Sequence, residues 1–350
     1  MGEFRKLYFL LQGLRGRYAC GGLWAELKTA QIAQEICDTA IVTYRQREPD
    51  TLFLGDLLKH RSQGAETLGR GITVVSWGFD VPELVRKLQP YLTLYHAHSS
   101  AYGFWLPPQV PIVTVSRNTL GYWGQRAPSS LLYYLPNEIS PEFHNRHLPQ
   151  RTIDVLVQAR KSSSYLLQHL IPALQSQCRV DVLQGFVEDL PSVFNQAKVY
   201  LYDSAEYWAI QGVTEGFGLQ PLEAMACGCQ VFSSLNHGLS DYLDPGFNSH
   251  KIGAYSLNYD LQRILAIVQH YTPPSLSETQ LAEYRRPNIL DRLSTILTEI
   301  NHYFDYLQHT NDRPIAPLSP QRILSLRWQR NWQKLKKGIG NRDWELKIRN

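Results

Sequence analysis

The chain has 350 residues, which is enough for about two domains at roughly 150 residues each. Hydrophobic residues make up 43% of it and charged residues 19%, a composition that excludes a disordered or fibrous protein. The net charge of +4 arises in residues 321–350, where nine Lys or Arg accompany two acids; residues 1–320 carry 26 basic and 29 acidic side chains, which argues against nucleic-acid binding. No apolar run reaches the roughly 18 to 20 residues of a membrane span, and the first apolar stretch is too short for a secretory signal. We therefore expect a soluble, cytoplasmic protein.

Apolar, β-branched or aromatic runs alternate with amphipathic stretches through the first half of the chain. This alternation predicts βα units around a parallel sheet, with a helix over residues 23–35. The predicted strands lie at residues 6–12, 39–44, 72–76, 92–95, 112–115 and 131–135.

A second series begins after residues 136–152, which contain three prolines and no periodicity and are interpreted as a linker. Its predicted strands lie at residues 153–157, 179–183, 198–202 and 230–233, followed by helices over 259–307 and a Pro-rich break at 311–320. We therefore predict an N-terminal domain over 1–145, a C-terminal domain over 146–310 and a terminal segment over 311–350. Two doubly wound domains leave a cleft between the carboxyl ends of their sheets, where such folds bind ligands.

The most informative segment is residues 213–232, VTEGFGLQPLEAMACGCQVF. Its glycines and Pro221 are typical of a loop that follows a strand and leads into the N-terminus of a helix. Such an N-terminus offers free backbone N–H groups to a phosphate. Two carboxylates, Glu215 and Glu223, flank it. Because they would repel an anion, they indicate recognition of ribose or hexose hydroxyls.

This segment resembles the Glu-x7-Glu motif of the retaining GT-B glycosyltransferases of family 4. Both glutamates, the Gly-Phe-Gly-Leu between them and the Glu-Ala-Met-Ala-Cys-Gly at the second glutamate agree with the family pattern. The resemblance implies an α/β fold of the GT-B type, in which two doubly wound, Rossmann-like domains face a central cleft. It implies that Glu215 contacts hydroxyls of the donor sugar in catalysis and that Glu223 holds the ribose of the nucleotide. It also places the donor against Gly216, Phe217, Gly218 and Leu219.

Two further features follow the order that the family shows. The Cys20-Gly-Gly22 turn is similar to the glycine loop of the family's N-terminal domain, which implies that the backbone of Gly21 and Gly22 approaches the donor; a plain turn is the alternative. The segment His96-Ala-His98 is similar to the family's histidine loop, and His98 is the better candidate for contact with the sugar and the acceptor. A histidine at a strand end often has a structural role instead.

The cations that bind the diphosphate in family members are only partly kept. Family members end the first strand of the C-terminal domain in Gly-Arg, with a Lys five residues after the Arg. Here Arg160 keeps its place, but Tyr165 occupies the position of the Lys, and Lys161 would supply the charge from another direction. Val187 lies in a segment similar to the loop whose backbone binds the base.

The resemblance implies a hexosyltransferase reaction with retention of configuration, in which a UDP- or GDP-linked sugar is the donor. The leaving diphosphate needs charge neutralisation, from a divalent metal or from fixed cations. Because the sequence has no Asp-x-Asp pair, we expect no metal and assign this role to Arg160, Lys161 and the helix N-terminus. No cofactor beyond the donor is expected, and the leaving phosphate is expected to accept the proton of the acceptor.

Residues 321–350 are predicted to form a basic amphipathic helix. Lys and Arg lie between apolar residues that recur every three or four positions, namely Trp328, Trp332, Leu335 and Ile339. The helix either lies on an anionic membrane surface or packs back on the N-terminal domain. Membrane contact would place the protein peripherally on the cytoplasmic face and fit a lipid-linked acceptor, as in cell-envelope glycan assembly; otherwise the acceptor is a glycan.

Two other functions stay open at this point. The altered Arg-Lys region allows a degenerate GT-B module that binds a nucleotide sugar or a partner without turnover. An NAD-dependent enzyme is disfavoured, because the early glycines at positions 13, 16, 21 and 22 do not form Gly-x-Gly-x-x-Gly.

Overall fold

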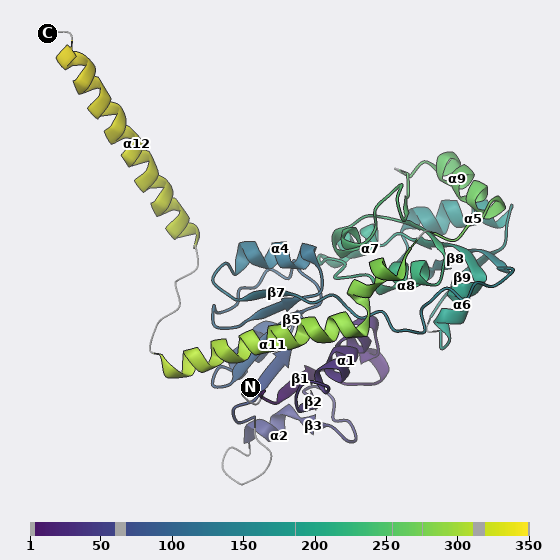
Figure 1. Cartoon of the computed structure of the whole chain (residues 1–350), viewed down its shortest axis with the longest axis horizontal. Coiled ribbons are helices and arrows are strands. Elements are labelled where there is room, and N and C mark those ends of the chain that lie inside the picture. Colours follow the sequence, from purple (N-terminus) through teal and green to yellow (C-terminus); the bar gives the residue numbers. More distant parts are fainter. Residues whose placement is uncertain are drawn as a thin grey trace.

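The computed structural model describes residues 4–59, 68–185, 187–253, 255–274, 276–310 and 319–348. These residues form two α/β domains, each built on a parallel sheet, with one long helix alongside the first domain and a separate C-terminal helix (Figure 1). The two parallel sheets with their helices confirm the predicted class of two doubly wound domains.

The first domain contains a seven-stranded parallel sheet in the order β3-β2-β1-β4-β5-β6-β7. Strand β1 (Leu7–Leu11), LYFLL, is an inner strand of this sheet and is buried throughout, as expected of a parallel strand with helices on both faces. In register, Leu10 of this strand lies opposite Val42 on one side and Val75 on the other. The strands are β1 (Leu7–Leu11), β2 (Thr39–Thr43), β3 (Leu52–Phe53), β4 (Ile72–Val75), β5 (Leu92–Ala97), β6 (Ile112–Thr114) and β7 (Leu132–Tyr134). The helices of this domain are α1 (Gly21–Ala33), α2 (Leu54–Lys59), α3 (Val81–Lys87) and α4 (Arg117–Arg126), with a short turn η1 (Gly16–Tyr18).

The second domain contains a five-stranded parallel sheet in the order β12-β11-β10-β8-β9. Its strands are β8 (Ile153–Gln158), β9 (Val180–Leu183), β10 (Ala197–Tyr202), β11 (Gln230–Ser233) and β12 (His250–Lys251). Its helices are α5 (Ile171–Gln175), α6 (Leu190–Gln196), α7 (Ala205–Gln211), α8 (Leu219–Ala226), α9 (Leu257–Gln269) and α10 (Glu278–Leu281), with η2 (Ala159–Lys161), η3 (Leu166–Leu170), η4 (His237–Asp241) and η5 (Ala282–Tyr284) as shorter turns.

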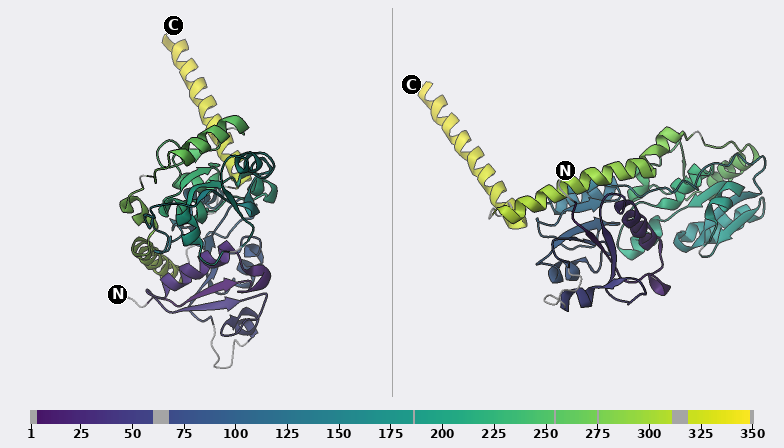
Figure 2. Two further views of the ribbon diagram at one scale, coloured as in Figure 1. Left: turned by 90° about the vertical axis from the view of Figure 1, so that its right-hand side faces the viewer. Right: turned by 60° about the horizontal axis from the view of Figure 1, so that its bottom comes forward.

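Helix α11 (Arg286–His309) returns from the second domain and lies along the first, as two views show (Figures 1 and 2). Its apolar stripe packs in one buried cluster with strands β1 and β4, and the contributing side chains are Ile289, Leu293, Ile296, Leu297, Ile300 and Phe304. The assignment of residues 286–309 to the C-terminal domain therefore needs correction. Helical periodicity predicts the stripe, but it does not say which sheet the stripe covers.

Helix α12 (Pro320–Ile348) projects away from both domains (Figure 2). Its described side chains, over residues 320–335, are all exposed. Large apolar side chains are among them, including Trp328 and Trp332 at 66% and 53% exposure. Within the described ranges, no helix has both the length and the apolarity that crossing a membrane demands.

Candidate functional site

The loop between α7 and α8 carries residues 215–218 and lies against the first domain. At Gly216, an added Cβ atom would lie 1.5 Å from the main-chain oxygen of His98, at the end of β5. On the other side, a Cβ added to Gly238 in η4 would lie 2.0 Å from the oxygen of Gly216. Glycine is therefore required at position 216, because the loop passes between β5 of one domain and η4 of the other.

Hydrogen bonds join the two domains at the same place. The Ser99 hydroxyl donates to the Thr214 carbonyl oxygen at 2.6 Å, and the Ser100 N–H donates to the Thr214 hydroxyl oxygen at 3.0 Å. Nearby, the first N–H of α4, on Arg117, donates to Asp241 of η4 at 2.8 Å. The carboxyl end of β5 and the loop before α8 thus meet at the domain interface, where ligands bind in such folds.

Glu215 is 3% exposed, and its carboxylate accepts hydrogen bonds from three side chains. Tyr202 and Trp208 donate to Oε2 at 2.5 and 2.6 Å. Lys161 donates to Oε1 at 3.2 Å and supplies the opposite charge. A carboxylate has about four lone-pair sites, so room remains at Oε1 to accept one hydroxyl of a ligand.

Glu223, in the second turn of α8, is buried, and none of the hydrogen bonds of the described residues involves its carboxylate. Burial raises the pKa of Glu223 to about 7; the charge of Lys28 in α1 opposes this effect and that of Glu142 adds to it. A buried carboxyl group that lacks a hydrogen-bond partner costs the folded protein free energy. Glu223 is therefore available to bind hydroxyl groups at the interface.

The cations near the loop are arranged differently from the sequence pattern of the family. Lys161 points into the site, with its ammonium 4.6 Å from the centre of the Trp208 ring in addition to its bond with Glu215. Tyr165, at the position of the expected lysine, donates to Asp260 at 2.8 Å, on the side of α9. Arg160 is exposed, and no hydrogen bond or ion pair of the described residues involves it.

The N-termini of α8 and α1 present free backbone groups. Gly218 is the N-cap of α8, with φ +77°, and offers no side-chain cap to the N–H groups of the first turn. The N-cap of α1, Cys20, also makes no side-chain cap bond. Cβ atoms added to Gly21 and Gly22 would meet nothing closer than the Trp77 ring, at 3.8 Å. The first turns of both helices can therefore receive an anion.

Other predicted donor residues differ in what they offer. The Phe217 side chain is 2% exposed and packs against Tyr242 and Tyr284, so only its backbone is available to a ligand. Leu219 begins α8 and is half-buried, and Val187 is half-buried in the turn after β9. Their assignment to the donor site stays a prediction.

His98 and a buried acid form the part of the site that belongs to the first domain. The His98 side chain keeps 16% exposure, whereas that of His96 keeps only 3%, so His98 is the more accessible of the two rings; its contact with a ligand stays a prediction. Both rings approach Oε2 of Glu26 in α1. Glu26, His96 and His98 thus form a group, within the described residues, whose ligand atoms lie close enough together to hold a metal ion.

Sequence reasoning missed four residues that shape this site. From the sequence alone, the Trp208 ring either stacks on a sugar or fills a core; in the structure its indole N–H donates a hydrogen bond to Glu215. Tyr202, His237 and Glu26 gave no signal, since each is a single residue of a strand, turn or helix. His237 accepts a hydrogen bond from the Glu215 N–H at 3.2 Å. Only their contacts across the fold reveal these roles.

Comparisons with known proteins agree with this architecture. Residues 157–256 match the family model described as glycosyl transferases group 1, which confirms the resemblance to glycosyltransferases that the motifs suggested. No curated protein matches the chain.

Several solved structures share the fold. The pneumococcal O-GlcNAc transferase GtfA, in complex with UDP and GlcNAc, has 10% identity and a TM-score of 0.62, over 86% of this chain and 100% of that one. The sucrose-phosphate synthase of Thermosynechococcus elongatus has 13% identity and a TM-score of 0.55, over 87% and 99%. Anabaena HepE, in complex with UDP and glucose, has 15% identity and a TM-score of 0.54, over 87% and 98%. These similarities confirm the predicted GT-B fold.

Proposed function

We propose that this protein is a glycosyltransferase that moves a sugar from a nucleoside diphosphate sugar to a glycan or lipid-linked acceptor. The observation that carries the proposal is the placement of two buried glutamates at the domain interface: Glu215 lies on the loop that abuts His98, and Glu223 lies in helix α8, which follows that loop. The match to the glycosyl transferases group 1 model supports it, as does UDP in two of the structures of similar fold.

In this proposal the two glutamates bind the two ends of the donor. Glu223 accepts hydrogen bonds from the ribose hydroxyls, because its carboxylate is enclosed and has no partner of its own. Glu215 uses its remaining acceptor site for a hydroxyl of the sugar, while Tyr202 and Trp208 fix its orientation. The anomeric carbon then lies between them, near His98.

The diphosphate is neutralised without a metal ion in this scheme. Lys161 replaces the expected lysine, since Glu215 and the Trp208 ring hold its ammonium inside the site. Arg160 is exposed and free to turn toward a phosphate, and the uncapped first turn of α8 adds backbone N–H donors. These positive charges and backbone donors stabilise the leaving group as the bond to the anomeric carbon breaks.

Retention of configuration is part of the proposal. We assign no protein group as a covalent nucleophile. The leaving phosphate accepts the proton of the acceptor hydroxyl on the face from which it departs, so the new bond forms with the original configuration. This step requires that donor and acceptor lie together and that water is excluded.

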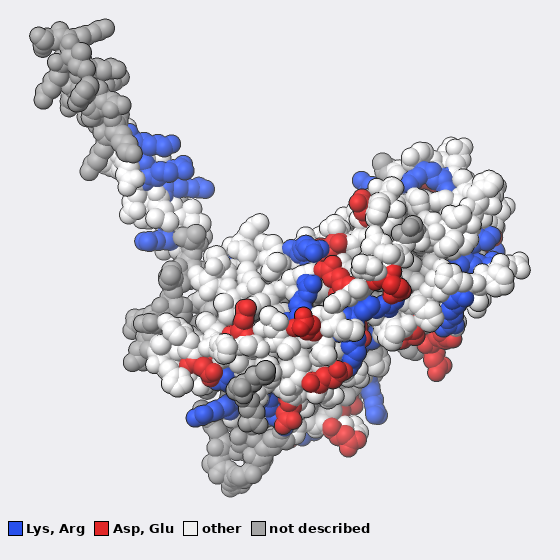
Figure 3. Space-filling view, viewed as in Figure 1, with Lys and Arg blue, Asp and Glu red and all other residues white. Residues whose placement is uncertain are grey.

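The acceptor side of the proposal concerns α12. Lys and Arg gather on residues 320–335 of this helix, and no acid accompanies them in that range (Figure 3). Exposed Trp328 and Trp332 lie among these cations. A helix of this kind binds the surface of an anionic membrane, which would bring the site to a lipid-linked acceptor on the cytoplasmic face.

A panel of UDP- and GDP-linked sugars, labelled in the sugar, tests the proposal. We expect hydrolysis or transfer with at least one donor, and Glu223→Ala should weaken nucleotide binding by about 1 to 3 kcal/mol. The control is Glu35→Ala, since Glu35 is exposed and pairs with Arg286 away from the loop. Saturable binding without turnover under any acceptor would instead support a binding module, which the tyrosine at position 165 favours.

A further inference from the structure

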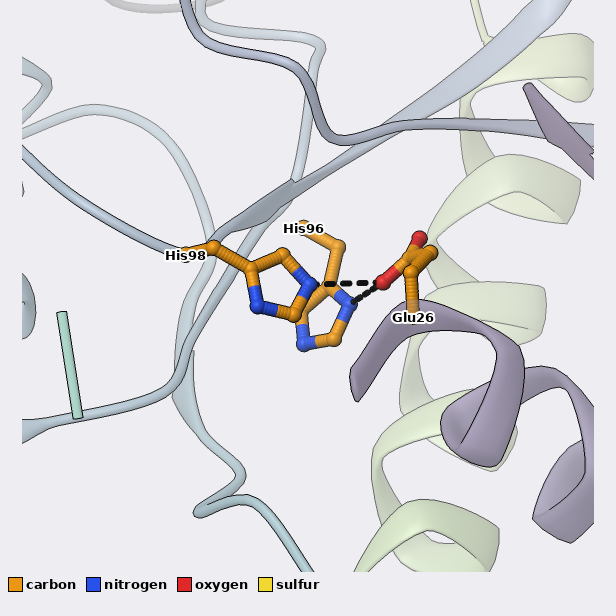
Figure 4. A group of neighbouring side chains, drawn as sticks. All are labelled: Glu26, His96 and His98. Carbon is orange, nitrogen blue, oxygen red and sulfur yellow. Dashed lines mark hydrogen bonds and ion pairs between the residues drawn. The ribbon is translucent and has the colours of Figure 1, made fainter. Parts of the chain in front are cut away.

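A buried carboxylate in α1 binds both histidines at the end of β5. Oε2 of Glu26 lies 2.5 Å from Nδ1 of His96 and 2.7 Å from Nε2 of His98 (Figure 4). Glu26 is 1% exposed, and its other oxygen, Oε1, is buried without a hydrogen-bond partner. The carboxylate therefore directs all of its hydrogen bonding to the two imidazoles, at the cost of an unsatisfied buried oxygen.

The charges of the group determine where the ring protons lie. Burial raises the pKa of Glu26, but the charges and hydrogen bonds of His96 and His98 outweigh it and bring the pKa to about 2. For His98, burial and then the charge of His96 lower the pKa below its ordinary value, against the effect of Glu26. An ionised carboxylate only accepts hydrogen bonds, so Nε2 of the neutral His98 ring must carry the proton. The lone pair then belongs to Nδ1.

Only His98 can offer its second nitrogen to a ligand. Nδ1 of His98 lies on the side of the ring away from Glu26 (Figure 4), and the side chain keeps 16% exposure. By contrast, Nε2 of His96 is buried without a partner. The main-chain oxygen of His98 abuts Gly216, so this ring belongs to the same site as the loop before α8.

We infer that Glu26 is a positioning residue for His98: its carboxylate holds the ring in the tautomer that presents Nδ1 as a hydrogen-bond acceptor to a hydroxyl of the bound sugar. This inference rests on the proposed function. His96 is the second donor that keeps the carboxylate in place. A hydrogen bond that a histidine N–H donates to an ionised carboxylate fixes both the tautomer and the ring orientation.

The distances distinguish this arrangement from a metal site. The ligand atoms of Glu26, His96 and His98 lie within 4.8 Å of one another. Two ligands of a tetrahedral Zn²⁺, each at about 2.0 to 2.1 Å, stand about 3.3 Å apart. The N-to-O distances of 2.5 and 2.7 Å are shorter and match hydrogen bonds to a carboxylate.

The first test needs no turnover. In protein labelled with ¹⁵N-histidine, long-range ¹H–¹⁵N spectra report the tautomer of each ring, and His98→Ala identifies the signals of His98. In the unsubstituted protein we expect His98 to carry its proton on Nε2 at pH 7. In Glu26→Gln we expect that this tautomer is no longer the single form of the ring. The Nδ1–H tautomer in the unsubstituted protein, or unchanged His98 signals in Glu26→Gln, would overturn the inference.

The second test uses the donor that the protein turns over. Glu26→Gln should lower kcat/KM by about 10- to 100-fold, and Glu35→Gln, also near α1, should change it by less than about twofold. In a His98→Ala background, Glu26→Gln should add less than about a twofold loss. An equal loss of kcat/KM in both backgrounds would overturn the inference. So would one equivalent of zinc bound to the unsubstituted protein but not to Glu26→Gln. If no nucleotide sugar is turned over, the proposed function fails, and the tautomer measurement still decides this point.

Discussion

Replacing Glu223 by Gln should stabilise the protein at alkaline pH. Burial raises the pKa of Glu223 from an ordinary 4.5 to about 7. Because the folded pKa lies above the unfolded one, the contribution of this group to stability is fully present below about pH 4.5 and is lost as the pH rises through about 7. At about 1.4 kcal/mol per pH unit, the interval between the two pKa values corresponds to about 3 kcal/mol of unfolding free energy.

The assay compares urea unfolding of the unsubstituted protein and Glu223→Gln at pH 5 and pH 8. Gln is nearly the same size as Glu and stays neutral at both pH values. The unfolding free energy of Glu223→Gln, relative to that of the unsubstituted protein, should therefore rise by about 2 to 3 kcal/mol from pH 5 to pH 8. Glu35→Gln controls for the removal of an exposed carboxylate. An advantage that does not change with pH, or a loss of stability at pH 8, would refute the reasoning from burial.

Three further predictions concern the loop, the metal and the tail. Gly216→Ala should lower kcat/KM at least about tenfold with unchanged far-ultraviolet circular dichroism, because its Cβ would lie 1.5 Å from a main-chain oxygen; full activity would contradict the close approach. Excess EDTA should leave turnover unchanged, since Lys161 and the α8 N-terminus carry the positive charge; a loss that Mg²⁺ restores would contradict this scheme. The double variant Trp328→Ala, Trp332→Ala should sediment less with vesicles that contain anionic lipid; if the unsubstituted protein does not sediment with them, the membrane proposal is wrong.

Most of the fold followed from local patterns in the sequence. Every predicted strand is present, because buried parallel strands are continuous apolar runs bounded by turn residues. The edge strands β3 and β12 were missed, since two residues carry no periodicity. The helical region at residues 259–307 is divided among α9, α10, η5 and α11, and only the last returns to the first domain.

The candidate site was predictable where one segment contains it. Glu215 and Glu223 belong to a continuous motif, and both are buried at the domain interface. Glu26 binds histidines that lie 70 and 72 positions away, so no spacing rule could pair them. Trp208 required the structure as well, because an aromatic residue in a loop gives the same signal whether it stacks on a ligand or orients a carboxylate.

A crystal structure of the protein with UDP or GDP tests the central claim most directly. The account predicts that the ribose hydroxyls lie within hydrogen-bond distance of the Glu223 carboxylate, with the diphosphate at Lys161 and the first turn of α8. A nucleotide bound elsewhere, with Glu223 still lacking a hydrogen-bond partner, would contradict it.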